Sequence, residues 1–520
     1  MNRLLHRLLP AALLLFASVS LSATVVTGRV SCEGEPLAGV SVSDGENVVL
    51  TDAQGCYTIK SKLELGYVFI SVPSGYEVPS DGVLPVFFKR LSASLSKASA
   101  DFSLKKVDQS KCNLIVYNDI HLVGDKKEKD LEQAHEGFFP DVLAEYEKLK
   151  DVPVYGLTVG DMTSDNKWYT HNFGLPEYLK EVSVLPFQIY HCMGNHDNDL
   201  RGGGGDFNSS KTYREVIGPN YYSINIGAYH IVFLDNIFYD QPADENGWVS
   251  AKGYHTHLDG VQLRWLRNDL KNVAPDTPIL LVAHAPFSRL EGVDKGEDRF
   301  RDGFNDGYYG ADVLNMFRKF GSVHLLTAHT HENYFVQINS RILEHNNIGV
   351  SAASWKTKQY CGLNIIRDGV PGGYSVYTID GRDLSWYYKA VGFKADECQF
   401  RGYDVNVIPE ELREGAPDNT IWVNVFNYDP AWTVSLKEDG KDLDVQRAFI
   451  RDPLYRLGID HTKLGKGAFK SMPNNHMFTA RASRPDSSIE ITVTDRFGKV
   501  YKQTLERPAH FGLDMFLGNK

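Results

Sequence analysis

The chain has 520 residues, of which 42% are hydrophobic, and its formal net charge at pH 7 is −11. This length and apolar content allow several buried cores, and the length predicts two to four domains. The negative charge disfavours nonspecific binding to nucleic acid, so we expect no nucleic-acid partner.

The first residues place Arg3 and Arg7 before an apolar run, Leu8–Phe16, which is followed by small residues. This order is typical of a secretory signal peptide, and we expect residues 1–23 to be removed. Removal takes away two arginines and no acids, so the net charge changes from −11 to −13. The run is shorter than the roughly 20 apolar residues that cross a bilayer, so no stable membrane insertion is expected. We therefore expect an exported protein, periplasmic or secreted.

The chain contains six cysteines, and export permits them to form disulfides. Cys32 and Cys56 are a candidate pair because both lie in one small predicted domain, while Cys361 and Cys398 are a weaker candidate. Buried free thiols are an equally good interpretation, because large domains do not depend on such cross-links.

Residues 24–107 alternate short β-type runs with turn residues, which predicts a small antiparallel β-sandwich. The segments PLAGVSVSDG and TDAQGCYTI resemble the carboxypeptidase-regulatory or transthyretin-like modules that precede many exported enzymes. The resemblance implies a structural or adhesive accessory domain, and the segment contains no set of catalytic residue types.

Residues 108–354 have a different pattern, in which apolar β-type runs alternate with helical periodicity, as in residues 131–150 and 259–272. This alternation predicts an α/β layered fold with functional residues at the carboxyl ends of the strands. From residue 355 to 520, β-type runs separated by turn residues return, which predicts a mainly β domain. The first of these strands could instead complete the central sheet.

Polar side chains follow several of the central β-type runs, at the point where each run ends. They are Asp119 and His121, Asp161, Asn195 with His196 and Asp197, His284, and His329 with His331. Oxygen and nitrogen donors of these kinds suit Mn, Fe or Zn, and the absence of cysteine among them argues against a structural zinc site. We expect these side chains to meet at one edge of the domain as a metal site.

The order of these elements, D-x-H, G-D, G-N-H-D, H and H-x-H, resembles the calcineurin-like metallophosphoesterase superfamily over residues 113–332. The one departure is Ala328, which stands where the family usually has glycine, and no ligand is lost by it. The resemblance implies a four-layer core, in which a β-sandwich is flanked by helices. The layout with a β domain on either side is similar to exported bacterial members of this superfamily.

The resemblance also implies two divalent metal ions that share one bridging carboxylate. Asp119, His121 and His331 are the implied ligands of the first ion, and Asn195, His284 and His329 those of the second. Asp161 is the implied bridge. Such a pair of ions lowers the pKa of a bound water, orients the resulting hydroxide towards phosphorus and stabilises charge on the phosphoryl oxygens.

His196 and Asp197 are the expected catalytic residues that do not bind metal. His196 lies next to the implied ligand Asn195, and we expect it to protonate the leaving oxygen or stabilise the transition state. We expect Asp197, which is not itself a ligand, to orient the imidazole of His196.

The expected activity is hydrolysis of a small phosphorylated substrate, with phosphodiesters favoured. A phosphomonoesterase or nucleotidase and a pyrophosphate-type hydrolase are the alternatives within this class. The purple acid phosphatase branch is disfavoured, because Ser164 stands where that branch has tyrosine and His121 is retained. An alternative of another class is a surface protein that binds glycan or a partner, with an inactive phosphoesterase core as scaffold. The oligomeric state is not predicted.

Two further segments flank the predicted ligands. Residues 201–206 are rich in glycine but lack the lysine and hydroxyl residue of a phosphate-binding loop, so we expect a flexible loop at the rim of the site. Residues 287–310 are either a loop that contacts the substrate or a solvated loop without contact to it. The remaining histidines have no motif context, and we expect them to be packed or surface residues.

Overall fold

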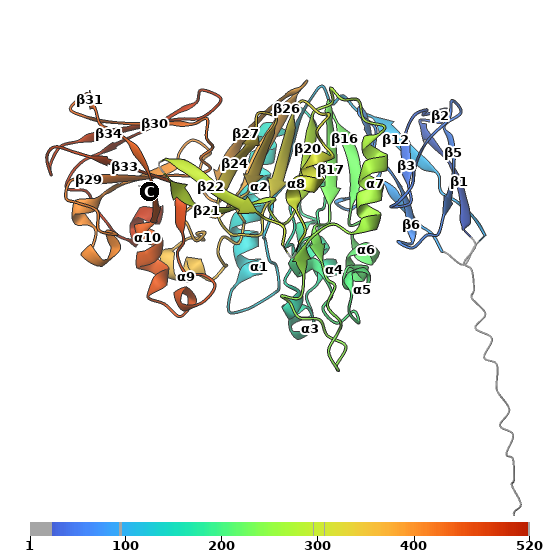
Figure 1. The fold of residues 1–520 in the computed structure, drawn as a ribbon, viewed down its shortest axis with the longest axis horizontal. Helices are drawn as coiled ribbons and strands as arrows, with labels where there is room; N and C mark the ends of the chain where they lie inside the picture. The colour runs from blue at the N-terminus through green and yellow to red at the C-terminus, as the bar shows by residue number, and fades with distance from the viewer. Residues whose placement is uncertain (1–22, 93–95, 295, 306, 518–520) are drawn as a thin grey trace, which may run out of the picture.

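The structure is a computed structural model that describes residues 23–92, 96–294, 296–305 and 307–517. The predicted signal peptide, apart from Ala23, lies outside the described residues. Three β-rich parts follow one another along the chain, with the N-terminal part at the right of Figure 1 and the C-terminal part at the left. Within the described ranges, no helix has the length and apolar character that spanning a membrane requires.

The N-terminal part consists of two β-sheets. The first contains β1 (Thr24–Cys32), β2 (Glu35–Pro36), β5 (Cys56–Ser61), β7 (Tyr76–Glu77), β11 (Lys97–Ser99) and β12 (Phe102–Lys106). The second contains β3 (Ser41–Ser43), β4 (Val48–Leu50), β6 (Tyr67–Ile70) and β10 (Phe88–Arg90). A small hairpin of β8 (Ser80–Asp81) and β9 (Leu84–Pro85) follows β7. Apolar side chains of both sheets, such as Val26 and Val42, lie in one core, as the period-2 pattern predicts.

All six cysteines are free, so neither candidate disulfide is formed. Cys56 lies opposite Arg29 in the β1–β5 pair, three positions along β1 from Cys32. Three residues of strand span about 10 Å, which exceeds the roughly 7 Å that two bridged Cα atoms can be apart. Cys361 and Cys398 are buried in separate apolar clusters.

The central part contains two sheets that pack face to face. One sheet has the order β15 (Ile189–Tyr190), β14 (Val154–Thr158), β13 (Lys111–Tyr117), β26 (Gly373–Asp380) and β27 (Asp383–Ala390). The other has the order β16 (Tyr222–Ile226), β17 (Tyr229–Leu234), β20 (Ile279–Ala283), β23 (Val323–Thr327), β25 (Ile342–Asn346) and β24 (Tyr334–Asn339). Leu114 and Val116 of β13 share a core with Ile231 and Phe233 of β17, so the two sheets form a sandwich.

Helices cover the outer faces of both central sheets. Ile115 and Tyr117 of β13 point away from the sandwich and pack with residues of α2 (Phe139–Leu149) and α4 (Leu175–Val182). On the opposite side, Trp265 of α7 (Gly260–Leu270) and Val313 of α8 (Gly310–Asn315) are buried in the core that contains the second sheet. The short helices α1 (Asp130–Gln133), α3 (Trp168–His171), α5 (Asp206–Ser209) and α6 (Lys211–Val216) lie in the connections. The result is the expected order of helix, sheet, sheet and helix (Figure 1).

The first two strands after the predicted boundary at 354/355 belong to the central part. β26 pairs with β13 through six residue pairs from Lys111↔Asp380 to Val116↔Ser375, and β27 pairs with β26. The boundary is corrected on this ground, and the alternative that these strands complete the central sheet holds. The reason is that β13 needs a partner on the side opposite β14, because unpaired backbone groups of a buried strand are costly.

The C-terminal part is a second sandwich of two four-stranded sheets. One contains β28 (Phe400–Asp404), β29 (Thr420–Val425), β33 (Pro473–Arg481) and β32 (Gln446–Arg451). The other contains β31 (Lys441–Asp442), β30 (Thr433–Glu438), β34 (Ile489–Thr494) and β35 (Val500–Leu505). The short helices α9 (Thr357–Cys361) and α10 (Pro453–Tyr455) add buried residues to a cluster beside β28 and β29.

Residues 287–310 include a hairpin of β21 (Ser288–Asp294) and β22 (Glu297–Asp302), where a loop is predicted. The hairpin reaches from the central part to β32 and β33 of the C-terminal part. The Arg447 guanidinium forms an ion pair with Asp298, and both side chains are largely buried. The segment is therefore part of the contact between the two parts.

Candidate metal centre

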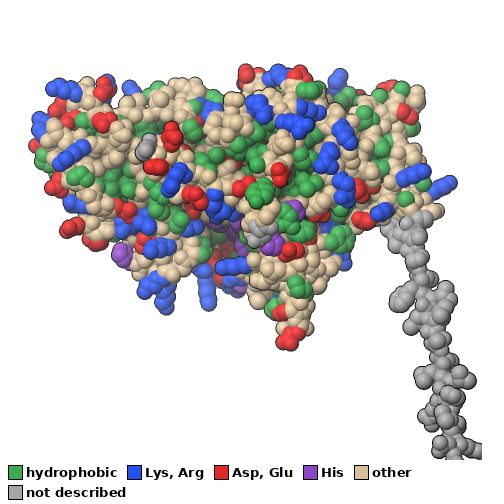
Figure 2. All heavy atoms as spheres, in the orientation of Figure 1, with side chains coloured by type: hydrophobic (Ala, Val, Ile, Leu, Met, Phe, Trp, Pro, Cys, Tyr) green, Lys and Arg blue, Asp and Glu red, His purple; other side chains and the backbone are tan. Residues whose placement is uncertain are grey.

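The predicted ligands follow the carboxyl ends of strands in both central sheets. Asp119 and His121 follow β13, Asp161 follows β14, Asn195 follows β15, His284 follows β20, and His329 and His331 follow β23. A group of histidine side chains is visible in a hollow below the middle of the molecule in Figure 2. The two sheets therefore bring residues that are more than 200 positions apart in the sequence to one edge of the sandwich.

Five of these residues have a left-handed backbone, with φ between 46° and 72°. They are Asp119, His121, Asp161, His329 and His331. Such a conformation costs a non-glycine residue about 1–3 kcal/mol, and it persists only where the surrounding structure enforces it. Strained residues gathered at one edge indicate a functional site.

The glycines of the Gly-Asp and Gly-Asn motifs are required by close packing. At Gly160, where φ is 92°, an added Cβ would lie 2.4 Å from Nδ1 of His284. At Gly194, it would lie 2.3 Å from the backbone nitrogen of Asp161. A side chain at either position would therefore displace a predicted ligand.

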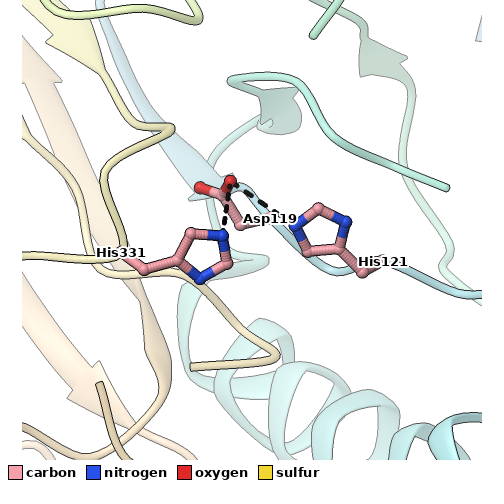
Figure 3. Close-up of side chains that lie close together, drawn as sticks. All are labelled: Asp119, His121 and His331. Atoms are coloured by element: carbon pink, nitrogen blue, oxygen red, sulfur yellow. Dashed lines mark ion pairs between the residues drawn. The ribbon is translucent and has the colours of Figure 1, made fainter. Parts of the chain in front are cut away.

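The first group of donors consists of Asp119, His121 and His331, whose donor atoms lie within 4.8 Å of one another. Oδ1 of Asp119 is 3.7 Å from Nε2 of His121 and 3.6 Å from Nε2 of His331. Both contacts converge on the same carboxylate (Figure 3). The two imidazole rings are stacked, with centroids 5.3 Å apart.

The second group consists of Asp161, His284 and His329, and its donor atoms meet the same distance criterion. Nε2 of His284 is 3.2 Å from Oδ2 of Asp161 and 3.2 Å from Nδ1 of His329. The amide oxygen of Asn195 is 3.1 Å from the same Nε2 atom of His284. Oδ2 of Asp161 is also 3.7 Å from Nε2 of His121, so this oxygen lies between the two groups.

The ring nitrogens of three histidines that point away from the groups contact backbone carbonyls. Nδ1 of His121 is 3.1 Å from the Thr163 carbonyl, and Nδ1 of His284 is 2.7 Å from that of Val159. Nδ1 of His331 contacts the carbonyl of Ala352. Such contacts fix the tautomer with hydrogen on Nδ1 and leave Nε2 free, as in metal-bound histidines. His329 differs, because its Nδ1 faces the second group.

The donor set fits divalent metal ions. Oδ1 of Asp119 is buried and has no hydrogen-bond partner, although it is surrounded by ring nitrogens. Burial raises the pKa of Asp161, but the charges of His284 and His196 outweigh this effect and hold the pKa well below its usual value. A buried carboxylate oxygen without a partner is costly, and a bound cation would satisfy it.

His196 lies beside the two groups, with its ring centroid 5.3 Å from that of His121. Nδ1 of His196 is 2.7 Å from Oδ1 of Asp165. Burial disfavours the charged imidazolium, but the charge of Asp161 and the hydrogen bond to Asp165 outweigh it and raise the pKa of His196 to about 9. Asp165 is therefore the residue that orients His196.

The predicted role of Asp197 as the partner of His196 is wrong. Its carboxylate accepts hydrogen bonds from the backbone nitrogens of Gly194 (2.9 Å), Met162 (2.9 Å) and Thr163 (3.2 Å). Asp197 thus ties together the two loops that carry Asp161 and Asn195. Sequence reasoning missed Asp165, because an aspartate four residues after Asp161 carries no motif signal.

The remaining predictions concern residues around the centre. Residues 201–205 form turns and bends that lead into α5, and the expected rim position stays a prediction. Among the described histidines, those without motif context contribute to neither donor group. His230, for example, is buried and contacts Asp269 at 2.9 Å and Asn225 at 2.9 Å, which is a structural role.

Family comparisons match the three parts of the chain in order. The profile described as "N terminal of Calcineurin-like phosphoesterase" matches residues 24–107, and "Calcineurin-like phosphoesterase" matches residues 113–333. "C terminal of Calcineurin-like phosphoesterase" matches residues 344–501. A fold with two donor groups at the strand ends and these three matches define a metallophosphoesterase. The chain belongs to the calcineurin-like phosphoesterases with N- and C-terminal domains, and it is a phosphoric ester hydrolase.

Solved structures similar to the chain include a dimetal phosphatase from Danio rerio, with 11% identity, a TM-score of 0.36, and coverage of 54% of this chain and 96% of that chain. A purple acid phosphatase from yellow lupin has 12% identity and a TM-score of 0.36, with coverage of 66% and 56%. A 5'-nucleotidase from Candida albicans has 11% identity and a TM-score of 0.29, with coverage of 54% and 51%. No curated protein matches the chain.

Proposed function

We propose that the protein hydrolyses phosphate esters at a dinuclear metal centre, with phosphodiesters favoured over phosphomonoesters. The observation that carries the proposal is the position of Oδ2 of Asp161, which lies 3.2 Å from Nε2 of His284 and 3.7 Å from Nε2 of His121. A carboxylate that lies between two donor groups is placed so that it can serve both ions. The ions are two divalent metals, Mn, Fe, Zn or similar, because oxygen and imidazole donors suit all of these.

The residues of the chain have separate tasks in this proposal. Asp119, His121 and His331 would hold one ion, Asn195, His284 and His329 would hold the other, and Asp161 would contribute to both. Two bound divalent ions would supply a nucleophile from water at neutral pH and stabilise phosphoryl charge. His196, held by Asp165, lies beside the first group and donates a proton to the leaving oxygen.

The test is metal content and hydrolysis of an aryl phosphodiester and an aryl phosphomonoester by the wild type and by Asp161→Ala and Asn195→Ala. Asp161→Ala is expected to lose both ions and all measurable turnover, because the shared ligand is removed. Asn195→Ala is expected to lower the occupancy of one ion. A wild type that binds no metal and hydrolyses neither ester would refute the proposal.

Two finer proposals concern the first 107 residues. We propose that the protein is exported, on the basis of Arg3, Arg7 and the apolar run Leu8–Phe16, with N-terminal sequencing of the mature protein as the test. A mature chain that retains residues 1–23 would contradict it. We also propose that residues 24–107 are a transthyretin-like structural module, supported by two sheets whose apolar side chains share one core.

A further inference from the structure

Three exposed side chains, Tyr169, Arg201 and Trp248, form a stack on segments that follow the Asp161 and Asn195 motifs in the chain. The guanidinium of Arg201 lies over the ring of Tyr169 at 4.0 Å and over the ring of Trp248 at 4.0 Å. Tyr169 is 46% exposed and Trp248 is 46% exposed, so the stack lies at the surface of the protein. The stack joins three segments that are separate in the sequence, α3, the glycine-rich turn and the loop before β19 (His255–Thr256).

The stack holds the guanidinium in place but leaves its edges free. Both faces of Arg201 are covered by rings, so the side chain loses much of its rotational freedom before any ligand binds. Its N–H groups make no hydrogen bond or ion pair with the residues that the structure describes. A planar guanidinium with open N–H edges is suited to bind the oxygens of phosphate or carboxylate.

The carboxylates of Asp199 and Asp244, close to Arg201 and Trp248 in the chain, accept hydrogen bonds from groups other than the Arg201 guanidinium. Oδ1 of Asp199 accepts from the Tyr169 hydroxyl at 2.7 Å and from the Arg201 backbone nitrogen at 2.9 Å. Oδ1 of Asp244 accepts from the backbone nitrogen of Trp248 at 2.9 Å. These aspartates therefore hold the loops of the stack in place, and neither of them forms an ion pair with the guanidinium of Arg201.

The stack is linked to the segment that carries His196, because the Tyr169 hydroxyl donates to Asp199. Asp199 follows His196 by three residues, so their Cα atoms are at most about 11 Å apart. Trp168, the neighbour of Tyr169, donates from Nε1 to Oγ1 of Thr163 at 2.8 Å, and the carbonyl of Thr163 contacts His121. The stack is thus coupled to the loops that carry the donor of the leaving-group proton.

We propose that Arg201, held between Tyr169 and Trp248, binds a second anionic group on the leaving portion of the substrate, either a phosphate or a carboxylate. The inference rests on the proposed function, because it assigns the leaving portion to the side of His196. The substrates favoured by this site are phosphoesters whose alcohol or phenol carries a negative charge of its own.

The test compares aryl phosphoesters with three leaving groups, phenol, para-carboxyphenol and para-phosphonophenol, each as a monoester and as a methyl diester. For Arg201→Ala, kcat/KM is expected to fall about tenfold more for the two charged leaving groups than for phenol, mainly through KM. The carboxylate and phosphonate arms distinguish the two kinds of anion. Trp248→Ala is expected to reduce the same selectivity, and Trp248→Phe to retain most of it.

Arg484→Ala is the matched control, because Arg484 is an exposed arginine of the C-terminal part that pairs with Asp439. It is expected to leave the selectivity unchanged. An equal loss for all leaving groups in Arg201→Ala, or no loss at all, would overturn the inference.

Calorimetric titration with para-phenylene bisphosphonate and phenylphosphonate separates this result from failure of the proposed function. Tighter binding of the bisphosphonate, lost in Arg201→Ala, supports the anion site even in a protein without turnover, and equal binding in both proteins contradicts it.

Discussion

At the scale of single residues, two aspartates near the centre, Asp165 and Asp197, have different structural roles. Asp165 contacts the ring of His196, whereas Asp197 accepts three backbone hydrogen bonds from the loops around Asp161 and Asn195. One carboxylate thus acts on a catalytic side chain and the other on the backbone that carries the ligands. Substitution of Asp165 should therefore affect mainly turnover, whereas substitution of Asp197 should affect mainly the free energy of unfolding.

Asp165→Ala is expected to retain bound metal and to lower kcat about 10–100-fold, because the imidazole of His196 loses the acceptor that orients it. His196→Ala is expected to retain metal as well, with a larger loss of turnover. Metal analysis and steady-state kinetics on the purified variants check both. Loss of metal from either variant would contradict the assigned roles.

Asp197→Ala is expected to lower the free energy of unfolding by at least about 3 kcal/mol, since it leaves three buried backbone N–H groups without an acceptor. Chemical denaturation with metal-free protein measures this effect. Asp165→Asn is the control, because asparagine has the same shape as the aspartate that it replaces. The free energy of unfolding of this variant is expected to differ little from that of the wild type. Equal stability of Asp197→Ala and the wild type would argue against the structural role.

At the scale of secondary-structure elements, a buried glutamate joins the segment after His284 to the second central sheet. Oε1 of Glu344, on β25, accepts from the backbone nitrogen of Phe287 at 2.7 Å and from Oγ1 of Thr327, on β23, at 3.1 Å. Oε2 is buried without a partner. Burial raises the pKa of Glu344 to about 7, so the carboxyl is protonated in the folded protein at mildly acidic pH.

A carboxyl whose pKa is raised by folding stabilises the folded protein fully at a pH below the pKa of the unfolded chain. This stabilisation is lost as the pH rises to the pKa of the folded protein and beyond it. We expect Glu344 to lower the unfolding free energy by up to about 3 kcal/mol between pH ~4.5 and pH ~7. Denaturation of the wild type and Glu344→Gln across this range measures the contribution as a difference in slope. A wild-type slope that is identical to that of Glu344→Gln would disprove it.

At the scale of the whole molecule, the N-terminal and central parts share one apolar core. Phe69 of β6 contacts the fully buried ring of Trp265 on α7, with centroids 6.3 Å apart, and Phe87 contacts Tyr222 at 4.6 Å. The backbone nitrogen of Asn225 also donates to the carbonyl of Val72 at 2.8 Å. The N-terminal part therefore packs against, and stabilises, the central sheet that carries His284, His329 and His331.

Phe69→Ala is expected to destabilise the N-terminal and central parts together by about 3–5 kcal/mol, as deletion of a large buried side chain does. Near-UV circular dichroism and metal release during thermal unfolding should show one shared, shifted transition. Leu50→Ala, which removes an exposed side chain of the same part, is the control and should change stability by less than about 0.5 kcal/mol. Metal release that is unchanged in Phe69→Ala would show that the two parts unfold independently.

Much of the centre could be predicted from the sequence because its residues carry local signals. Asp119, Asp161 and His284 each end an apolar β-type run, and the carboxyl ends of such strands gather at one edge. The pairing of β26 with β13 was open, since a strand pattern does not state its partner. The role of Asp165 could not be predicted, because no motif marks this residue and only its hydrogen bond identifies it as the partner of His196.

The sequence by itself determined the residue types, their order and the strands that present them, because periodicity and motif spacing are local properties of the chain. Only the tertiary structure decided which aspartate holds His196, which strands complete the central sheet and which rings enclose Arg201. These features depend on contacts between segments far apart in the chain. Such contacts form when whole layers pack, and no local pattern encodes their partners.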